Sequence, residues 1–257
     1  MGEGTGVASG SPGDEGARSA VPDPRPPSPD RNIGVVIVAG GRGTRVGGAE
    51  LKQFRWVAGK PMLLHSVQTF MSHPEVSHVV CVLPSSHAAD PPPWLFQCDI
   101  ERLMISLGGR TRTESVYHGL QDLADDAEIV LVHDAARPFV DLATIDRVIA
   151  VARAGRAAVA GVPVVDTLKQ VAGDDRVTAT VPRDGLWRAQ TPQGFPRAML
   201  WAAHQAARKQ AVDATDDAAL VERLGHPVTM VQGSERAMKV TSEDDFARAE
   251  ALYALPS

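Results

Sequence analysis

A regular alternation of short apolar runs with longer amphipathic stretches constrains the fold of this chain more than any other feature. The first run, Ile33–Val38, is apolar apart from one glycine, as expected for a strand buried on both faces. The stretch that opens at Pro61 instead places Leu63, Val67 and Phe70 on one face of a helix. Strands that alternate with helices predict an α/β fold, a Rossmann-like, mostly parallel sheet with helices on both faces. Four further strands are predicted, at His78–Leu83, Arg102–Leu107, Glu128–Val132 and Ala157–Val162.

The pattern changes after the fifth predicted strand. Thr167–Val171 and Arg176–Val181 flank a Gly-Asp-Asp turn, which predicts a β-hairpin. We interpret this hairpin as an inserted arm at about residues 164–182. The Gly-, Pro- and Gln-containing segment that follows, at 182–193, is typical of an ordered loop. The later predicted elements are helices at Pro196–Gln210 and Asp216–Leu224, strands at Val228–Val231 and Ala237–Val240, and a last helix that Ser242 caps.

The first 32 residues differ in composition from the rest of the chain. They hold six Gly and six Pro, and no Leu, Ile, Phe, Trp or Tyr. Such a segment buries too little apolar surface to offset the entropy lost on ordering. We therefore predict a disordered Gly/Pro-rich tail over residues 1–32 and a folded domain over residues 33–257. A mis-assigned translation start explains the segment nearly as well as a functional tail does.

Composition narrows the classes of partner and compartment. The 26 Lys and Arg residues against 31 Asp and Glu give a formal charge of −5, whereas a general nucleic-acid binder needs a basic face. No apolar run approaches the roughly 20 residues of a membrane-spanning helix, and no signal peptide is visible. Cys81 and Cys98, the only cysteines, exclude a disulfide framework and a Cys-rich zinc site. We expect a cytoplasmic protein that binds neither nucleic acid nor membranes.

Three loops rich in Gly, Arg and Asp follow predicted strands. In a parallel sheet, ligands bind beyond the carboxyl ends of the strands, so the loops at those ends form the candidate site. The first loop is Ala39–Arg45, the second is Gly108–Arg112 and the third is His133–Pro138. Because the carboxyl ends of parallel strands meet at one edge of the sheet, we expect these three loops to lie together.

The loop after the first strand suits a phosphate. Gly40, Gly41 and Gly43 let backbone N–H groups approach a phosphate closely. The segment lacks both the Gly-Lys-Ser/Thr of a P-loop and the third glycine of a dinucleotide fingerprint, so a structural turn explains the glycines about as well. Arg45 and Lys52 place two cations nearby, and such a pair suits a polyphosphate.

The carboxylate at the end of the fourth predicted strand is the candidate metal ligand. Asp134 follows an apolar run, and Mg²⁺ normally binds through one or two carboxylates together with substrate phosphates. The alternative is an aspartate that caps the turn after it. His133 invites a general-base role, but a buried structural histidine is the favoured interpretation. Lys239 falls in a predicted short strand, where a lysine usually points to solvent.

Several motifs occur in a fixed order along residues 33–257. With them, the chain resembles the 2-C-methyl-D-erythritol 4-phosphate cytidylyltransferases of the non-mevalonate isoprenoid pathway. The glycine-rich loop alone indicates only a nucleotidyltransferase, whereas the HDAARP, RDGLW and TPQ segments are much more specific. The motifs are Val38-Ala-Gly-Gly-Arg-Gly-Thr-Arg45 with Lys52-Gln-Phe54, Val132-His-Asp-Ala-Ala-Arg-Pro138, Val165-Asp-Thr-Leu-Lys169, Arg183-Asp-Gly-Leu-Trp187 with Gln190-Thr-Pro-Gln193, Thr215-Asp-Asp217 and Lys239-Val-Thr241.

The resemblance implies an activity, a cofactor and a set of site residues. The activity is transfer of CMP from CTP to 2-C-methyl-D-erythritol 4-phosphate, with Mg²⁺ as cofactor and pyrophosphate as the leaving group. Asp134 would hold the Mg²⁺–triphosphate. The implied catalytic residues are Arg45, Lys52, Arg183 and Lys239. The implied nucleotide-binding residues are Ala39, Gly40, Gly41, Gly43, Gly109, Arg112, Ser115 and Ala135. The polyol phosphate would be held by Arg137, Thr167 and Thr215, together with Arg183 and Lys239.

The resemblance also implies an assembly. The arm at about residues 164–182 would interlock two subunits into a homodimer, so that some substrate contacts cross the interface.

Two other functions stay open. Ribitol-5-phosphate cytidylyltransferase is the nearest rival, because its nucleotide half is the same, although HDAARP and RDGLW fit the methylerythritol enzymes better. A non-catalytic nucleotide-binding regulatory protein would be expected to lack Arg45, Lys52 or Asp134, and all three are present.

Overall fold

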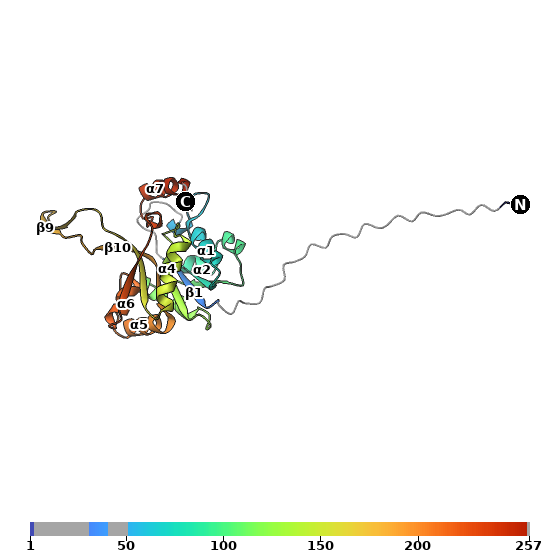
Figure 1. The fold of residues 1–257 in the computed structure, drawn as a ribbon, viewed down its shortest axis with the longest axis horizontal. Coiled ribbons are helices and arrows are strands. Elements are labelled where there is room, and N and C mark those ends of the chain that lie inside the picture. The colour runs from blue at the N-terminus through green and yellow to red at the C-terminus, as the bar shows by residue number, and fades with distance from the viewer. Residues whose placement is uncertain (3–30, 41–50, 256–257) are drawn as a thin grey trace.

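A seven-stranded sheet organises the chain in a computed structural model that describes residues 1–2, 31–40 and 51–255 (Figure 1). The strand order is β11-β7-β10-β6-β1-β4-β5, and neighbouring strands run parallel except at β10, which is antiparallel to both neighbours. Residues 3–30 of the predicted tail lie outside the described residues. The strands are β1 (Ile33–Val38), β4 (Val76–Leu83), β5 (Leu103–Leu107), β6 (Ile129–Asp134), β7 (Ala157–Pro163), β10 (Trp187–Pro196) and β11 (Val228–Gln232).

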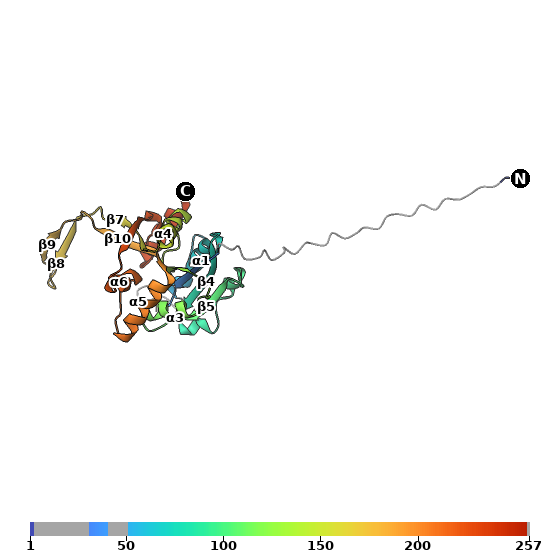
Figure 2. The ribbon, with the colours of Figure 1, turned by 60° about the horizontal axis from the view of Figure 1, so that its bottom comes forward.

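Helices cover both faces of this sheet. Alternate residues of β1 enter two separate hydrophobic cores, with Val35 and Ile37 in one and Val36 in the other. A strand whose successive side chains point to opposite faces needs such cover on each side. The predicted α/β class with a mostly parallel, Rossmann-like sheet is confirmed. The first core is closed by α1 (Met62–Ser72) and α4 (Leu142–Arg153), and the second by α3 (Arg112–Gln121), α5 (Arg197–Lys209) and α6 (Asp217–Arg223) (Figure 2).

A C-terminal helix and several small elements complete the fold. Ser242 caps α7 (Glu243–Ala254) as predicted, because its hydroxyl accepts from Asp245 N and the Asp245 carboxylate accepts from Ser242 N. The small elements are the 3₁₀ helices η1 (Lys52–Phe54), η2 (Pro93–Gln97) and η3 (Glu235–Ala237), the helix α2 (Ser85–Ala88), and the strands β2 (Trp56–Val57) and β3 (Lys60–Pro61).

The predicted arm is present as a separate hairpin. β8 (Leu168–Val171) pairs antiparallel with β9 (Val177–Val181), and the hairpin extends away from the sheet (Figures 1 and 2). Val171 and Val177 are both 55% exposed, so the arm carries apolar side chains that this chain does not cover.

Two expectations for the C-terminal half were wrong. The predicted loop at 182–193 contributes most of β10, a ten-residue strand between β6 and β7. Its sequence resembles a loop because Pro192, Gly194 and buried Gln and Thr residues replace the apolar pattern of a central strand. The predicted strand at Ala237–Val240 is also absent from the described sheets. Ser234 caps η3 there instead, with its hydroxyl accepting from Arg236 N at 3.1 Å.

No helix in the described part of the chain is long and apolar enough to cross a lipid bilayer.

His133 is a core residue of β6, as favoured from the sequence. Its side chain is fully buried and its ring lies 4.9 Å from that of Phe70 on α1, centre to centre. Nε2 donates to Arg137 O at 3.0 Å, so Nδ1 accepts from the Thr191 hydroxyl at 3.1 Å. Burial lowers the pKa of His133 to about 4. The imidazole is therefore neutral at pH 7 and is enclosed away from any substrate.

The pKa of His133 predicts an acid-sensitive fold. The unfolded chain takes up this proton near pH 6.5, and the folded protein only near pH 4. The His133 contribution to stability is therefore complete above pH 6.5 and is lost as the pH falls toward 4. Between pH 7 and pH 4.5 the free energy of unfolding should fall by about 2 kcal/mol more in the wild type than in His133→Asn.

Urea denaturation at each pH measures this difference. The exposed His226 offers the control, since His226→Asn should follow the wild-type curve. Parallel pH profiles for the wild type and His133→Asn would show that His133 is not held neutral by its burial.

Candidate active site

The candidate site lies where the strand order reverses. The chain runs outward from β1 through β4 to β5, and then returns to the other side of β1 as β6. Such a switch point opens a crevice beyond the carboxyl ends of the two strands. Val38, the last residue of β1, lies in register with Asp134, the last residue of β6. The glycine-rich loop thus leaves the sheet beside Asp134, although Gly41, Gly43 and Arg45 lie outside the described residues.

Asp134 is the centre of a cluster of cations. Lys239 Nζ donates to Asp134 Oδ2 at 2.7 Å, and Arg112 Nε donates to Oδ1 at 3.3 Å. Arg137 Nε lies 4.0 Å from Oδ2. Burial alone would raise the pKa of Asp134, but the charges of Arg112 and Lys239 hold it well below its usual range. The carboxylate is therefore ionised at neutral pH, and its side chain keeps 12% exposure.

The N-terminus of α3 brings the second loop to the first. Thr111 caps this helix by accepting from Glu114 N, and the Ser115 hydroxyl accepts from Gly109 N at 3.0 Å. A Cβ on Gly40 would lie 3.2 Å from Ser115 Oγ and 3.5 Å from Gly108 Cα. The described residues of the three predicted loops therefore lie together, as expected, and glycine at position 40 permits the close approach.

The segment around Lys52 contacts both the end of β1 and the segment before α7. The neighbouring Gln53 is buried and donates from Nε2 to Ala39 O at 2.6 Å, which fixes η1 beside the end of β1. The Phe54 ring packs 5.8 Å from that of Trp94 on η2, centre to centre. Lys52 Nζ donates to Val240 O at 2.8 Å. This link places Lys52 beside the residue that follows Lys239, so residues far apart in the sequence meet at the edge of the sheet.

The local pattern at Lys239 favours a side chain that points to solvent, whereas the resemblance implies a place for this lysine in the site. Its side chain is 45% exposed, but the ammonium contacts Asp134. The backbone before Lys239 is held by Arg137, whose guanidinium donates to Ala237 O at 2.9 Å and to Ala189 O at 3.2 Å. Arg137 thus fixes the segment that delivers Lys239 to the site.

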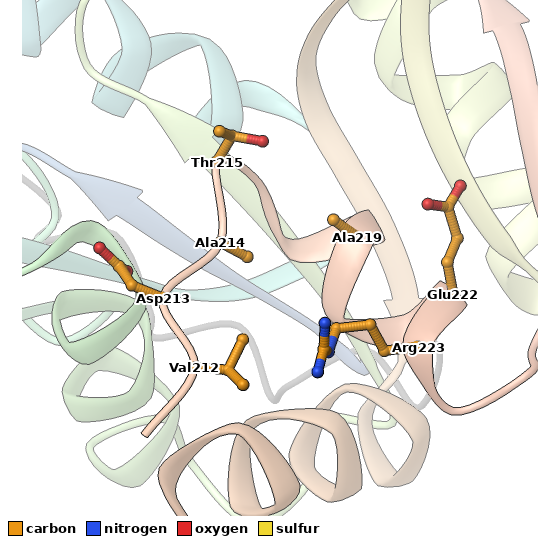
Figure 3. A pocket seen from close by; sticks show the side chains of 7 residues that line it. All are labelled: Val212, Asp213, Ala214, Thr215, Ala219, Glu222 and Arg223. Atoms are coloured by element: carbon orange, nitrogen blue, oxygen red, sulfur yellow. The ribbon is translucent and has the colours of Figure 1, made fainter. Parts of the chain in front are cut away.

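The structure shows three other predicted polyol-phosphate residues outside the contacts of Asp134. Thr167 and Arg183 are exposed at the base of the arm, where Arg183 donates to Val165 O. Thr215 lies on the loop before α6 and lines a pocket of about 500 Å³ with Glu222 and Arg223 (Figure 3). Within the described parts of one chain, Asp134 takes its hydrogen bonds and ion pairs from other residues than these three.

Sequence reasoning missed one buried part of the site. Asp217, the last residue of the Thr215-Asp-Asp217 motif, accepts from Arg112 Nη1 at 2.7 Å through Oδ2 and from His204 Nε2 at 3.0 Å through Oδ1. Asp217 and His204 are both fully buried. Burial alone would lower the pKa of Arg112, but Asp217 and Asp134 raise it above its usual range. The motif itself was the available sequence signal for Asp217. It did not identify Arg112 and His204 as the partners of this aspartate.

The carboxylate of Asp134 is compatible with an oxygen-preferring divalent cation. Among the described residues, no group of three or more His, Cys, Asp and Glu side chains could hold a metal by itself. A single partly exposed carboxylate fits Mg²⁺, which keeps several ligand positions for water and substrate phosphates. Ala135, predicted to lie near the ribose, is buried directly after Asp134.

Comparisons with known proteins identify the family of this chain. A family model described as "IspD: 2-C-methyl-D-erythritol 4-phosphate cytidylyltransferase" matches residues 33–254. A protein of that name from Salinibacter ruber is 45% identical over 223 residues, which are 86% of this chain and 92% of that protein. One from Bacillus velezensis is 40% identical over 220 residues, 85% of this chain and 94% of that protein.

The fold is also shared with solved structures. The crystal structure of the 2-C-methyl-D-erythritol 4-phosphate cytidylyltransferase from Thermus thermophilus is 36% identical in sequence, with a TM-score of 0.72. That match covers 86% of this chain and 98% of the Thermus chain. The family match, the relatives and the shared fold extend over the same domain. This chain therefore belongs to the 2-C-methyl-D-erythritol 4-phosphate cytidylyltransferase family of nucleotidyltransferase enzymes.

Proposed function

We propose that this enzyme transfers CMP from CTP to 2-C-methyl-D-erythritol 4-phosphate, releasing pyrophosphate, as a step of isoprenoid precursor synthesis. Membership of the family supports this proposal. The observation that carries it in the structure is the gathering of Arg112, Arg137 and Lys239 around Asp134 at the switch point of the sheet. A site with these groups suits two anionic substrates that meet over one carboxylate.

The reaction needs charge stabilisation more than proton transfer. A phosphate oxygen of the polyol attacks the α-phosphorus of CTP, and the bond from that phosphorus to the oxygen of the β-phosphate breaks. The nucleophile is already an anion, so no strong general base is required, and the buried His133 is not needed as one. The barrier lies in bringing two anions together and in stabilising a negatively charged transition state. Lysine and arginine side chains meet both needs.

Each charged group then has a distinct task in the proposal. Lys52, with Arg45, stabilises the charge that develops on the α-phosphate. Arg112 and the loops at Gly40 and Gly109 bind the nucleotide, and Lys239 and Arg137 face the polyol phosphate. Asp134 holds Mg²⁺, which when bound neutralises part of the triphosphate charge. The Lys52–Val240 and Lys239–Asp134 contacts support a shared site, because they bring the two lysines to one edge of the sheet.

A pyrophosphate-release assay tests the activity. The wild type with CTP and Mg²⁺ should release pyrophosphate with 2-C-methyl-D-erythritol 4-phosphate and should be at least about tenfold less efficient, in kcat/KM, with D-ribitol 5-phosphate. Faster turnover of ribitol phosphate would favour the rival cytidylyltransferase. No release with either acceptor would favour a non-catalytic nucleotide-binding protein.

Lys52 gives a sharper test of the chemical step. Lys52→Ala should lower kcat by about 10²–10³-fold, the usual cost of losing one group that stabilises transition-state charge. CTP should still bind, since the remaining nucleotide-binding groups are unchanged. The control is Lys60→Ala, because Lys60 is an exposed lysine paired with Gln68 at 2.7 Å and lies outside the site. Near-normal turnover by Lys52→Ala would contradict the assigned role.

We also propose that the enzyme works in the cytoplasm as a homodimer built through the arm. The exposed apolar residues of the arm support this, since a monomer rarely leaves such a surface uncovered. In a dimer of this kind, Thr167 and Arg183 of one subunit contact the polyol phosphate in the other. Their position outside the Asp134 cluster of their own chain is consistent with that arrangement.

The arm can be tested by placing charge on it. The double substitution Val171→Asp with Val177→Asp should shift the protein from dimer to monomer in sedimentation velocity, because burying two carboxylates in an apolar interface is costly. It should also reduce kcat/KM for the polyol phosphate. Ile100→Asp, at a 62% exposed residue off the arm, is the matched control. A double variant that stays dimeric would argue against an arm-built interface.

A further inference from the structure

Asp217 is a fully buried carboxylate that the proposed reaction leaves without a task. Its side chain is 1% exposed. It contacts Arg112 at Nη1, whereas Asp134 contacts the same guanidinium at Nε. A buried carboxylate is costly to maintain unless it is paired, and the two side-chain partners of Asp217 are Arg112 and His204. Any effect of Asp217 on the reaction should therefore act through Arg112.

The backbone at Asp217 is fixed from the central sheet. Gln193 Oε1 on β10 accepts from both Asp217 N at 3.1 Å and Ala218 N at 3.0 Å. Gln193 Nε2 in turn donates to Asp216 Oδ2 at 2.8 Å. The start of α6 is thus bound to a strand that neighbours β6, which carries Asp134. The positions of the two carboxylates are therefore set by adjacent strands of one sheet.

His204 orients the Asp217 side chain. Its ring is fully buried, and Nε2 carries the hydrogen that Asp217 Oδ1 accepts. Its Nδ1 has no hydrogen-bond partner among the described residues, so the contact with Asp217 is the hydrogen bond that fixes the ring. One oxygen of Asp217 thus contacts Arg112, while His204 binds the other oxygen and fixes the rotation of the carboxylate.

The guanidinium of Arg112 therefore donates to two carboxylates. Its Nη1 is 2.7 Å from Asp217 Oδ2, whereas its Nε is 3.3 Å from Asp134 Oδ1. Without Asp217, the planar guanidinium would be free to turn and pair with Asp134 through two parallel bonds. That pairing would occupy Asp134 and withdraw Arg112 from its place at the start of α3.

We propose that Asp217, oriented by His204, is a positioning residue that holds Arg112 for nucleotide binding and keeps Arg112 from closing over Asp134. The proposal rests on the proposed function, because it assigns Arg112 and Asp134 to the nucleotide half of the site. It assigns no contact between Asp217 and either substrate. Its effect should therefore appear in the use of CTP and not in the use of the polyol phosphate.

Asp217→Asn tests the proposal with little change in shape. We expect the KM for CTP to rise about tenfold, while kcat and the KM for the polyol phosphate change less than about threefold. The dissociation constant for CTP with Mg²⁺, measured by calorimetry without acceptor, should rise by a similar factor. An unchanged dissociation constant for CTP, or a loss confined to kcat, would overturn the proposal.

A double variant separates positioning from general stability. In an Arg112→Gln background, Asp217→Asn should change the KM for CTP less than about twofold, because its only route to the nucleotide has been removed. A purely structural role would lower activity equally in both backgrounds and would overturn the proposal. The wild type serves as the reference for the reaction itself. If it fails to turn over CTP with the acceptor, the proposed function fails, whereas the calorimetric coupling of Arg112 and Asp217 is measured independently.

His204 supplies a test that does not depend on the folding of Asp217 variants. His204→Leu removes the donor to Asp217 and should raise the dissociation constant for CTP about threefold. His204→Gln retains an amide N–H donor and should restore most of the wild-type affinity. Equal affinities in the wild type, His204→Leu and His204→Gln would contradict the orienting role.

Discussion

The ionised carboxylate of Asp134 is the group on which the arrangement of the site depends. It stands at the end of a fully buried strand, where burial opposes its charge and only nearby cations make that charge tolerable. The cations come from α3, from the loop after β6 and from the segment before α7. One buried charge thus recruits three segments that are distant in the sequence. The cations that stabilise the buried carboxylate therefore also make the crevice positively charged.

The antiparallel strand β10 provides the second constraint. A central strand usually carries apolar residues, but Gln190, Thr191 and Gln193 are all buried here. Each of these side chains has partners in a loop or strand end at the edge of the sheet. Gln190 Nε2 donates to Ser234 O, Thr191 Oγ1 accepts from Asp134 N, and Gln193 binds the start of α6. The polar residues of β10 therefore brace the segments that carry Asp134, Lys239 and Asp217.

The limits of sequence-based prediction follow from these two features. Strands such as β1 and helices such as α1 were predictable because burial imposes a period on their residues. The convergence of the three loops was also predictable, since parallel strands bring their carboxyl ends to one edge. β10 was not, because its polar residues are satisfied by partners that no local pattern reveals. The contact between Lys239 and Asp134 has no local signal for the same reason, as the two residues lie 105 positions apart in the chain.

The acidic net charge and the anionic substrates are reconciled by where the charges lie. A formal charge of −5 excludes a broad basic surface, but it does not fix the potential in one crevice. In the described part of the site, Lys52, Arg112, Arg137 and Lys239 outnumber Asp134 and Asp217 by four to two. Both carboxylates are buried and paired with these cations, whereas Lys239 keeps nearly half of its side chain exposed to an approaching phosphate. Asp217 contributes by orientation and not by charge. Because this carboxylate is fully buried, it fixes the direction of the Arg112 guanidinium without lying in the path of an approaching phosphate.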